Sequence, residues 1–196
     1  MSADPGRTPR EATRRATLRV VVTGPECTGK TTLARRLATR FAAPCVSEQA
    51  RLYAAAHSRP LHATDVEPIA LGFLAAQAIA TREVPPLLVL DTDLVSTVVY
   101  ARHYYGACAA WIEDEARRRT ADLYLLHLPD VPWIPEPGQR EGADRRAEQL
   151  ALFRAELAAI DAPVVEIAGG WELREERAVT AVERLVLRAG LGGQVP

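Results

Sequence analysis

The stretch LRVVVTGPECTGKTTLARRL, residues 18–37, decides the fold of this chain. Its first part, Leu18–Val22, is short, apolar and rich in β-branched residues, which is typical of a buried strand. From Thr31 to Phe41 the apolar residues recur at helical spacing. The stretch therefore predicts a strand, a glycine loop and a helix in direct succession.

The loop between that strand and that helix matches the phosphate-binding pattern GxxxxGK[ST] at residues 24–31. Its glycines let backbone N–H groups wrap a phosphate at a helix N-terminus, where unpaired donors and the helix dipole favour an anion. We expect Lys30 to reach the β- and γ-phosphates of ATP and the Thr31 hydroxyl to bind Mg²⁺. The candidate ATP-binding residues are Gly24, Pro25, Glu26, Cys27, Thr28, Gly29, Lys30, Thr31 and Thr32.

Lys30 is the single lysine of the chain, and every other basic side chain is an arginine. A compact ammonium at the one position where the motif needs a point charge indicates a chemical requirement.

Four further apolar runs alternate with helical patterns along the chain. Continuous apolar strands separated by helices are typical of a parallel sheet that is covered on both faces. We therefore predict an α/β fold of the P-loop NTPase and kinase class, with about five parallel strands and helices on both faces. The further strands are expected at Ala43–Val46, Leu87–Leu90, Leu123–Leu128 and Pro163–Ile167, and the longer helices at Thr64–Glu83, Leu94–Tyr105, Ala109–Thr120, Asp144–Ile160 and Leu173–Arg188.

Composition limits the classes of function. Residues 1–17 are basic and read as a disordered leader, and residues 18–190 as a single domain. The net charge of −1 offers no basic stripe for nucleic acid, and no apolar run is long enough to cross a membrane. Three cysteines without a CxxC pair fit a reducing cytoplasm.

Carboxylates follow the expected strands, at the edge of a parallel sheet where ligands bind. Asp91 comes directly after a strand, where it can hold Mg²⁺ or orient an acceptor hydroxyl. Asp93 can face the acceptor or cap the following helix. Glu48 and Arg51 can face the acceptor too, or form a surface pair three residues apart.

Residues 129–147 hold prolines followed by arginines and are expected to form a mobile lid over the phosphates. Arg140, Arg145 and Arg146 are the candidate lid cations, and Arg145 and Arg146 can equally form a solvated face. Lys30, Asp91 and Arg140 are the expected catalytic residues.

With these motifs in hand, the chain resembles the nicotinamide riboside kinase domain of NadR-type proteins. The resemblance runs from about Leu18 to Arg184 and rests on five blocks. They are GPECTGKTTLA at the loop, SEQARLY from Ser47, LDTD from Leu90, YYG from Tyr104 and DLYLLHLPDVPW from Asp122.

The resemblance implies phosphorylation of the ribose 5′-hydroxyl of nicotinamide riboside by ATP with Mg²⁺. Because this acceptor is a pyridinium cation, its pocket should offer carboxylates and aromatic faces. The residues assigned to the acceptor are Glu48, Arg51, Tyr53, Asp93, Tyr104, Asp130 and Trp133.

Residues 134–140 depart from the Asp-Gly-x-Arg segment that follows the tryptophan in that family, which leaves acceptor choice open. One alternative is a nucleoside or nucleoside monophosphate kinase in which Arg51 clamps an acceptor phosphate. Another is a nucleotide-binding regulatory switch. The sequence does not indicate an oligomeric state.

Overall fold

The protein is described by a computed structural model that covers residues 17–132 and 145–195. The expected leader lies almost wholly outside these residues, as do Trp133, Arg140 and most of the expected lid. In the described part of the chain, no helix is both long and apolar enough to span a bilayer.

Five strands form one parallel sheet in the order β2-β3-β1-β4-β5. This confirms the predicted class of fold. The strands are β1 (Leu18–Thr23), β2 (Cys45–Val46), β3 (Leu87–Asp91), β4 (Leu123–His127) and β5 (Val164–Ile167). The helices are α1 (Lys30–Arg40), α2 (Gln49–His57), α3 (Val66–Ala80), α4 (Leu94–Tyr105), α5 (Ala110–Arg118), α6 (Arg146–Ala159) and α7 (Trp171–Arg188), with a short 3-10 turn at Ala63–Asp65.

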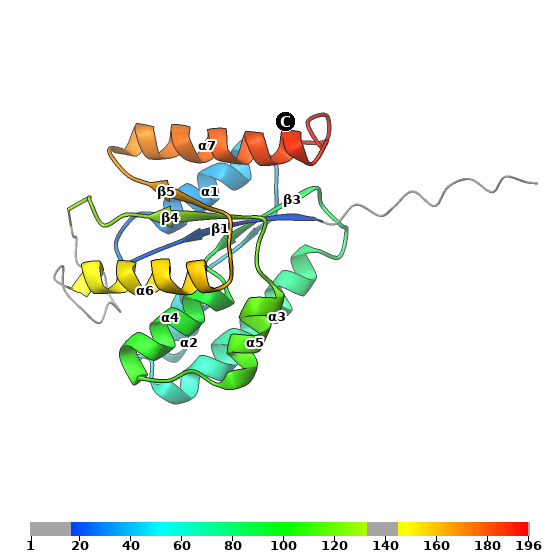
Figure 1. Cartoon of the computed structure of the whole chain (residues 1–196). Coiled ribbons are helices and arrows are strands. Elements are labelled where there is room, and N and C mark those ends of the chain that lie inside the picture. The colour runs from blue at the N-terminus through cyan, green and yellow to red at the C-terminus, as the bar shows by residue number, and fades with distance from the viewer. Residues whose placement is uncertain (1–16, 133–144, 196) are drawn as a thin grey trace, which may run out of the picture.

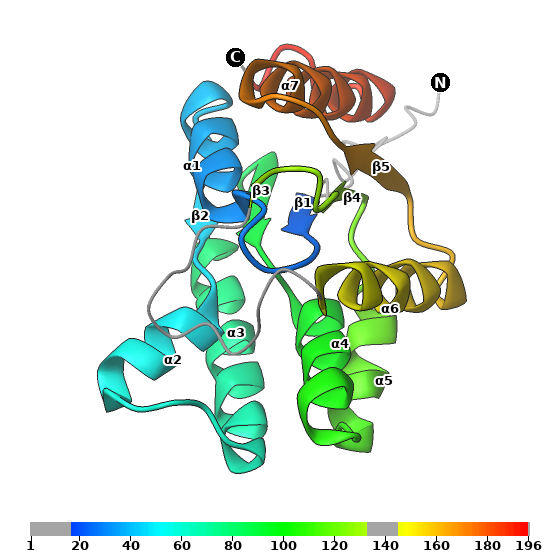
Figure 2. The same cartoon turned by 90° about the vertical axis from the view of Figure 1, so that its left-hand side faces the viewer.

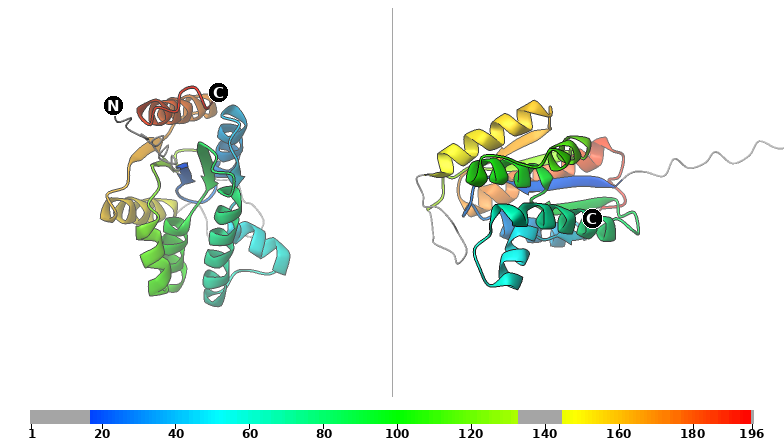
Figure 3. Two further views of the ribbon diagram at one scale, coloured as in Figure 1. Left: turned by 90° about the vertical axis from the view of Figure 1, so that its right-hand side faces the viewer. Right: turned by 90° about the horizontal axis from the view of Figure 1, so that it is seen from below.

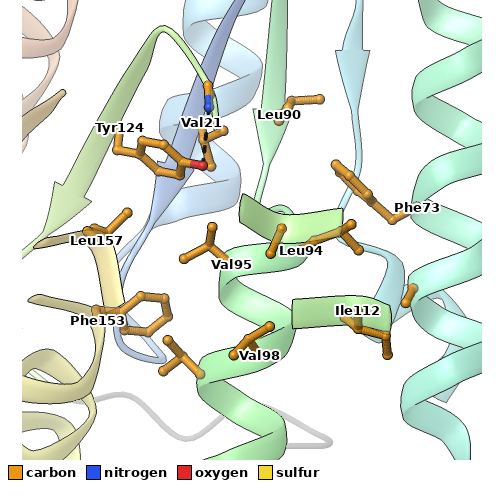
Figure 4. Packing of buried hydrophobic residues seen from close by; sticks show 14 of the residues in the cluster. Val21, Phe73, Leu90, Leu94, Val95, Val98, Ile112, Tyr124, Phe153 and Leu157 are labelled. Carbon is orange, nitrogen blue, oxygen red and sulfur yellow. Dashed lines mark hydrogen bonds between the residues drawn. The ribbon is translucent and has the colours of Figure 1, made fainter. Parts of the chain in front are cut away.

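Helices cover both faces of the sheet (Figures 1 and 3). On one face, Val21, Leu90 and Tyr124 of the central strands pack against α3, α4, α5 and α6, as Figure 4 shows. On the other face, Val20 and Val22 pack against α1 and α7. Successive residues of β1 thus point to opposite cores, which is why its apolar run is continuous and does not alternate.

The expected elements are present, with shorter ends in several places. The helix expected from Thr64 begins at Val66, because Asp65 closes a 3-10 turn by accepting a hydrogen bond from the His62 N–H at 2.8 Å. The last helix starts two residues before Leu173, at Trp171.

The carboxyl ends of all strands meet at the edge of the sheet that faces the viewer in Figure 2. In the register of the central pair, Val22 lies beside Asp91, so the loop after β1 and the last residue of β3 are neighbours. Functional groups from distant parts of the sequence are therefore gathered at one edge.

A buried arginine holds two of these strand ends together. The Arg174 side chain of α7 is fully buried and donates hydrogen bonds to the carbonyl oxygens of Leu128, Ile167 and Gly169 at 2.8 to 3.2 Å. It also forms an ion pair with Asp130. One guanidinium thus satisfies acceptors that follow both β4 and β5.

His127, at the end of β4, forms a hydrogen bond with the phosphate loop. Its Nδ1 lies 2.8 Å from the Thr28 carbonyl oxygen and the residue is fully buried. Burial, together with the nearby charges of Lys30 and Arg174, lowers the pKa of His127 from 6.5 to about 3. The imidazole is therefore neutral at physiological pH and donates to the loop.

Replacement of Arg174 by methionine should lower the free energy of unfolding by about 3 kcal/mol, because three carbonyls and a carboxylate lose their donor. Arg177→Met, on an exposed position of the same helix, is the matched control and should change it by less than about 0.5 kcal/mol. Urea denaturation of both variants measures the difference. Equal stabilities would show that Arg174 does not hold the strand ends.

The titration of His127 predicts a pH dependence of stability. Below pH 6.5 the unfolded chain binds a proton at His127, whereas the folded chain does not until the pH nears 3. Stability should therefore fall by up to about 1.4 kcal/mol per pH unit as the pH drops from 6.5. His127→Asn keeps a donor and removes the titration, so its unfolding free energy should fall less than that of the wild type between pH 6.5 and 5.

Candidate functional site

The loop of residues 24–29 takes the conformation that its glycines allow. Gly24 has a φ of 124°, and a Cβ there would lie 2.6 Å from the carbonyl oxygen of His127. Gly29 has a φ of 84° and is the N-cap of α1. The loop can lie this close to β4 only with glycine at position 24. The nine expected ATP-binding residues therefore occupy this loop and the first turn of α1.

Lys30 folds back across the loop. Its Nζ donates to the Pro25 carbonyl oxygen at 2.8 Å, and the residue is buried. The Thr28 hydroxyl donates to the same carbonyl oxygen at 2.9 Å. The ammonium is thus held at the mouth of the loop, where a bound phosphate can replace the carbonyl as its partner.

Asp91 ends β3 beside the loop and is 3% exposed. Burial and the neighbouring Glu48 raise the pKa of Asp91, while a hydrogen bond from Thr31 and the charge of Lys30 oppose that rise. Its Oδ1 is buried and has no hydrogen-bond partner among the described residues.

A buried carboxylate with an unused oxygen, next to a threonine hydroxyl, fits Mg²⁺ as it binds with phosphate. This metal keeps several waters and takes one or two protein ligands. The described residues contain no group of three or more His, Cys, Asp or Glu side chains that could hold an ion by themselves. Thr31 and Asp91 are therefore the pair that would hold it, alongside oxygens of the nucleotide.

A cavity of about 990 Å³ opens beside the loop. Its walls come from α2, residues 58–62, the first half of α3, and α4. The polar part of its lining includes Glu26, Glu48, Arg51, Tyr100 and Tyr104, and the apolar part includes Val66, Ile69 and Phe73. The cavity has the size of a small-molecule site and combines carboxylates with aromatic rings.

Glu48 and Arg51 form the ion pair that their spacing allows, at 3.2 Å, and both border the cavity. The Arg51 side chain is 58% exposed and that of Glu48 is 20% exposed. The pair thus forms the contact that its spacing allows and also borders the cavity, and its contact with an acceptor stays a prediction.

Three further residues assigned to the acceptor, Asp93, Tyr53 and Asp130, also have partners within the protein. Asp93 caps α4 through the Ser96 N–H at 3.1 Å and accepts from the Tyr124 hydroxyl at 2.8 Å, although it borders the cavity. Tyr53 stacks on His57 with ring centroids 3.9 Å apart and is not part of the cavity lining.

Asp130, the third, points to Arg174 and accepts from the Gly169 N–H at 2.6 Å, away from the cavity. These contacts hold the segments that follow β4 and β5 together, and Asp130 does not line the cavity.

The two lid arginines that the structure describes differ in environment. Arg145 is exposed and pairs with Glu148 at 3.0 Å. Arg146 is buried and donates to the Val131 carbonyl oxygen at 3.0 Å. Arg140, the third expected lid cation, lies outside the described residues. Trp133, which was assigned to the acceptor, lies outside them too.

Besides His127, two residues that hold the loop were not among those predicted from the sequence. The Tyr100 hydroxyl donates to the Gly24 carbonyl oxygen at 2.9 Å. Gln149 of α6 is 1% exposed and contacts both Glu26 and Tyr104. The spacing of Tyr100 and Tyr104, four residues apart on one helix face, was a usable signal. Nothing in the local sequence marks Gln149.

Comparison with known proteins agrees with this geometry. The AAA_28 family, described as an AAA domain, matches residues 19–174. The "Trifunctional NAD biosynthesis/regulator protein NadR" of Salmonella typhimurium strain LT2 is 28% identical over 139 residues, and that of Escherichia coli strain K12 is 27% identical. In both cases 68% of this chain aligns with 34% of the relative, so the chain spans about a third of the curated relatives' length.

Solved structures give the same picture. A NadR protein in complex with NR matches 88% of this chain and 52% of its own, with 26% identity and a TM-score of 0.71. A NadR protein with NAD and AMP-PNP covers 88% of this chain and 50% of its own, with 28% identity and a TM-score of 0.69.

A deoxyadenosine kinase from M. mycoides with bound dATP, 10% identical, covers 85% of this chain and 99% of its own at a TM-score of 0.54, and shows the fold alone. From the loop, the sheet and these matches together, the chain belongs to the AAA_28 family of P-loop proteins, with the fold of the P-loop kinases.

Proposed function

We propose that this protein transfers the γ-phosphoryl group of ATP to the ribose 5′-hydroxyl of nicotinamide riboside and so forms nicotinamide mononucleotide. The observation that carries the proposal is the cavity beside the phosphate loop, which presents Glu26 and Glu48 together with tyrosine rings. The similarity to NadR proteins, one of them solved with NR, supports the choice of acceptor.

The charges of the cavity favour this acceptor over a nucleotide. A pyridinium riboside carries a positive charge and no phosphate, so carboxylates attract it, whereas they repel a phosphate dianion. Of the cations in the lining, Arg51 pairs with Glu48 and Arg59 pairs with Asp65 at 2.6 Å. Lys30 lies at the loop, where the phosphates of ATP bind.

In the proposed reaction the 5′-oxygen forms a bond to the γ-phosphorus, and the bond from that phosphorus to the bridging oxygen of ADP breaks. Lys30 binds and orients the phosphates. Glu48 lines the cavity and Asp91 lies beside the loop at the end of β3, and either carboxylate can accept the hydroxyl proton. Thr31 and Asp91 would hold Mg²⁺ together with the nucleotide, and the bound ion would neutralise charge at the phosphates. ATP and Mg²⁺ are thus the proposed cofactors.

The first prediction of this proposal concerns acceptor choice. With ATP and Mg²⁺, nicotinamide riboside should give faster ADP release than cytidine, adenylate or thymidylate at equal concentrations. A coupled assay measures it. Faster turnover of a monophosphate would assign the protein to the nucleoside monophosphate kinases, and ATP hydrolysis that no acceptor accelerates would favour a regulatory switch.

The second prediction concerns the single lysine. Lys30→Arg keeps the positive charge, but the larger planar guanidinium does not fit the buried position that faces the Pro25 carbonyl. It should lower kcat/KM nearly as far as Lys30→Ala does, by about 3 kcal/mol of transition-state stabilisation. Arg82→Ala, at an exposed position after α3, is the control and should keep full activity. Normal turnover of either Lys30 variant would contradict the phosphate role of this residue.

A further inference from the structure

Glu26 belongs to the phosphate loop in sequence, but its contacts face the acceptor side. Its backbone N–H donates to the Gln149 side-chain oxygen at 3.2 Å, so this amide is directed to α6. Its carboxylate accepts from the Tyr104 hydroxyl at 2.9 Å, and the residue lines the cavity. The side chain is therefore part of the wall against which an acceptor would bind.

The position of this carboxylate is fixed by three elements. Gln149 of α6 also donates to the Tyr104 hydroxyl at 3.2 Å, so Glu26, Tyr104 and Gln149 form a closed set of hydrogen bonds. Tyr100, one turn before Tyr104 on α4, holds the loop at the Gly24 carbonyl. A carboxylate placed in this way loses little conformational entropy when a ligand binds.

The place of Glu26 decides which part of an acceptor it meets. It lies four residues before Lys30 in the loop that holds the transferred phosphate, so the acceptor atoms beside it are those nearest the reacting hydroxyl. In a riboside those atoms belong to the sugar. The apolar part of the lining, with Ile69 and Phe73, comes from α3 and not from the loop.

The chemistry of a carboxylate decides which groups it binds. An ionised carboxylate only accepts hydrogen bonds and has about four lone-pair sites, so one carboxylate can accept from Tyr104 and from ligand hydroxyls at the same time. After burial, Glu26 and Glu48 are the main causes that raise the pKa of Tyr100 well above its ordinary value. Both carboxylates therefore act on the same part of the cavity, which suits hydroxyl donors and disfavours phosphate.

We propose that Glu26, positioned by Tyr104 and Gln149, binds the vicinal hydroxyl groups of the acceptor's ribose. Through these bonds it selects an unphosphorylated riboside that carries both hydroxyls over the deoxy form that lacks one of them. This inference rests on the proposed kinase function and assigns a sugar-binding residue within it. Tyr104 and Gln149 are positioning residues for the carboxylate.

The test compares Glu26→Gln and Tyr104→Phe with the wild type on nicotinamide riboside and its 2′-deoxy and 3′-deoxy analogues. In the wild type, loss of the hydroxyl that Glu26 binds should lower kcat/KM about tenfold or more. In Glu26→Gln, kcat/KM for the riboside should fall by a similar factor and the further loss with the deoxy analogue should be less than about threefold. The kcat/KM of Tyr104→Phe should lie between the values of the wild type and Glu26→Gln. The KM for ATP should stay within about twofold of the wild-type value in both variants.

Glu176→Gln, an exposed glutamate of α7, is the matched control and should behave as the wild type. Thermal melting shows whether each variant folds, and Tyr104→Phe tests the idea independently if Glu26→Gln does not. If Glu26→Gln lowered kcat/KM by the same factor on the riboside and on both deoxy analogues, or if it raised the KM for ATP, the role of Glu26 would be overturned. The kinase proposal would be left standing. A wild type that phosphorylates no riboside would overturn both.

Discussion

The whole site depends on one close approach of two backbone segments, Gly24 of the loop and His127 at the end of β4. There is no room for a Cβ between them, since it would lie 2.6 Å from the His127 carbonyl oxygen. Because the loop lies so close, the Thr28 carbonyl reaches the His127 ring and the Gly24 carbonyl reaches the Tyr100 hydroxyl. The loop, β4 and α4 are therefore joined by direct contacts, and the loop and α4 both contribute to the wall of the cavity.

Without ligands, the site contains buried charged groups that lower the stability of the free protein. Asp91 is buried with a raised pKa and an oxygen that has no hydrogen-bond partner among the described residues. Lys30 is satisfied by one carbonyl of the loop. A magnesium nucleotide offers the complementary groups, a cation for Asp91 and an anion for Lys30. Such a preorganised arrangement sacrifices some stability of the free protein for strong binding of the ligand.

Contacts within the protein show how several of the candidate site residues are held. The Asp93 carboxylate caps α4 and accepts from Tyr124, a residue of β4 that lies 31 positions away. Asp130, which its position after a strand made a candidate for the acceptor, is bound by Arg174 from α7. Glu48 and Arg51 both pair and border the cavity. For Asp93 and Asp130 the tertiary structure supplies a partner distant in sequence, and the contacts of all these residues with an acceptor stay predictions.

The sequence by itself determined the sheet, the phosphate loop and the residues at its strand ends. These follow from local patterns, namely continuous apolar runs, glycine and lysine at fixed spacing, and carboxylates that follow strands. Only the tertiary structure decided that Glu26 lines the cavity, that Gln149 and Tyr104 hold it, and that Arg174 joins two strand ends. The physical reason is that each of these side chains meets at least one partner 44 to 123 residues away, and local patterns carry no information about such contacts.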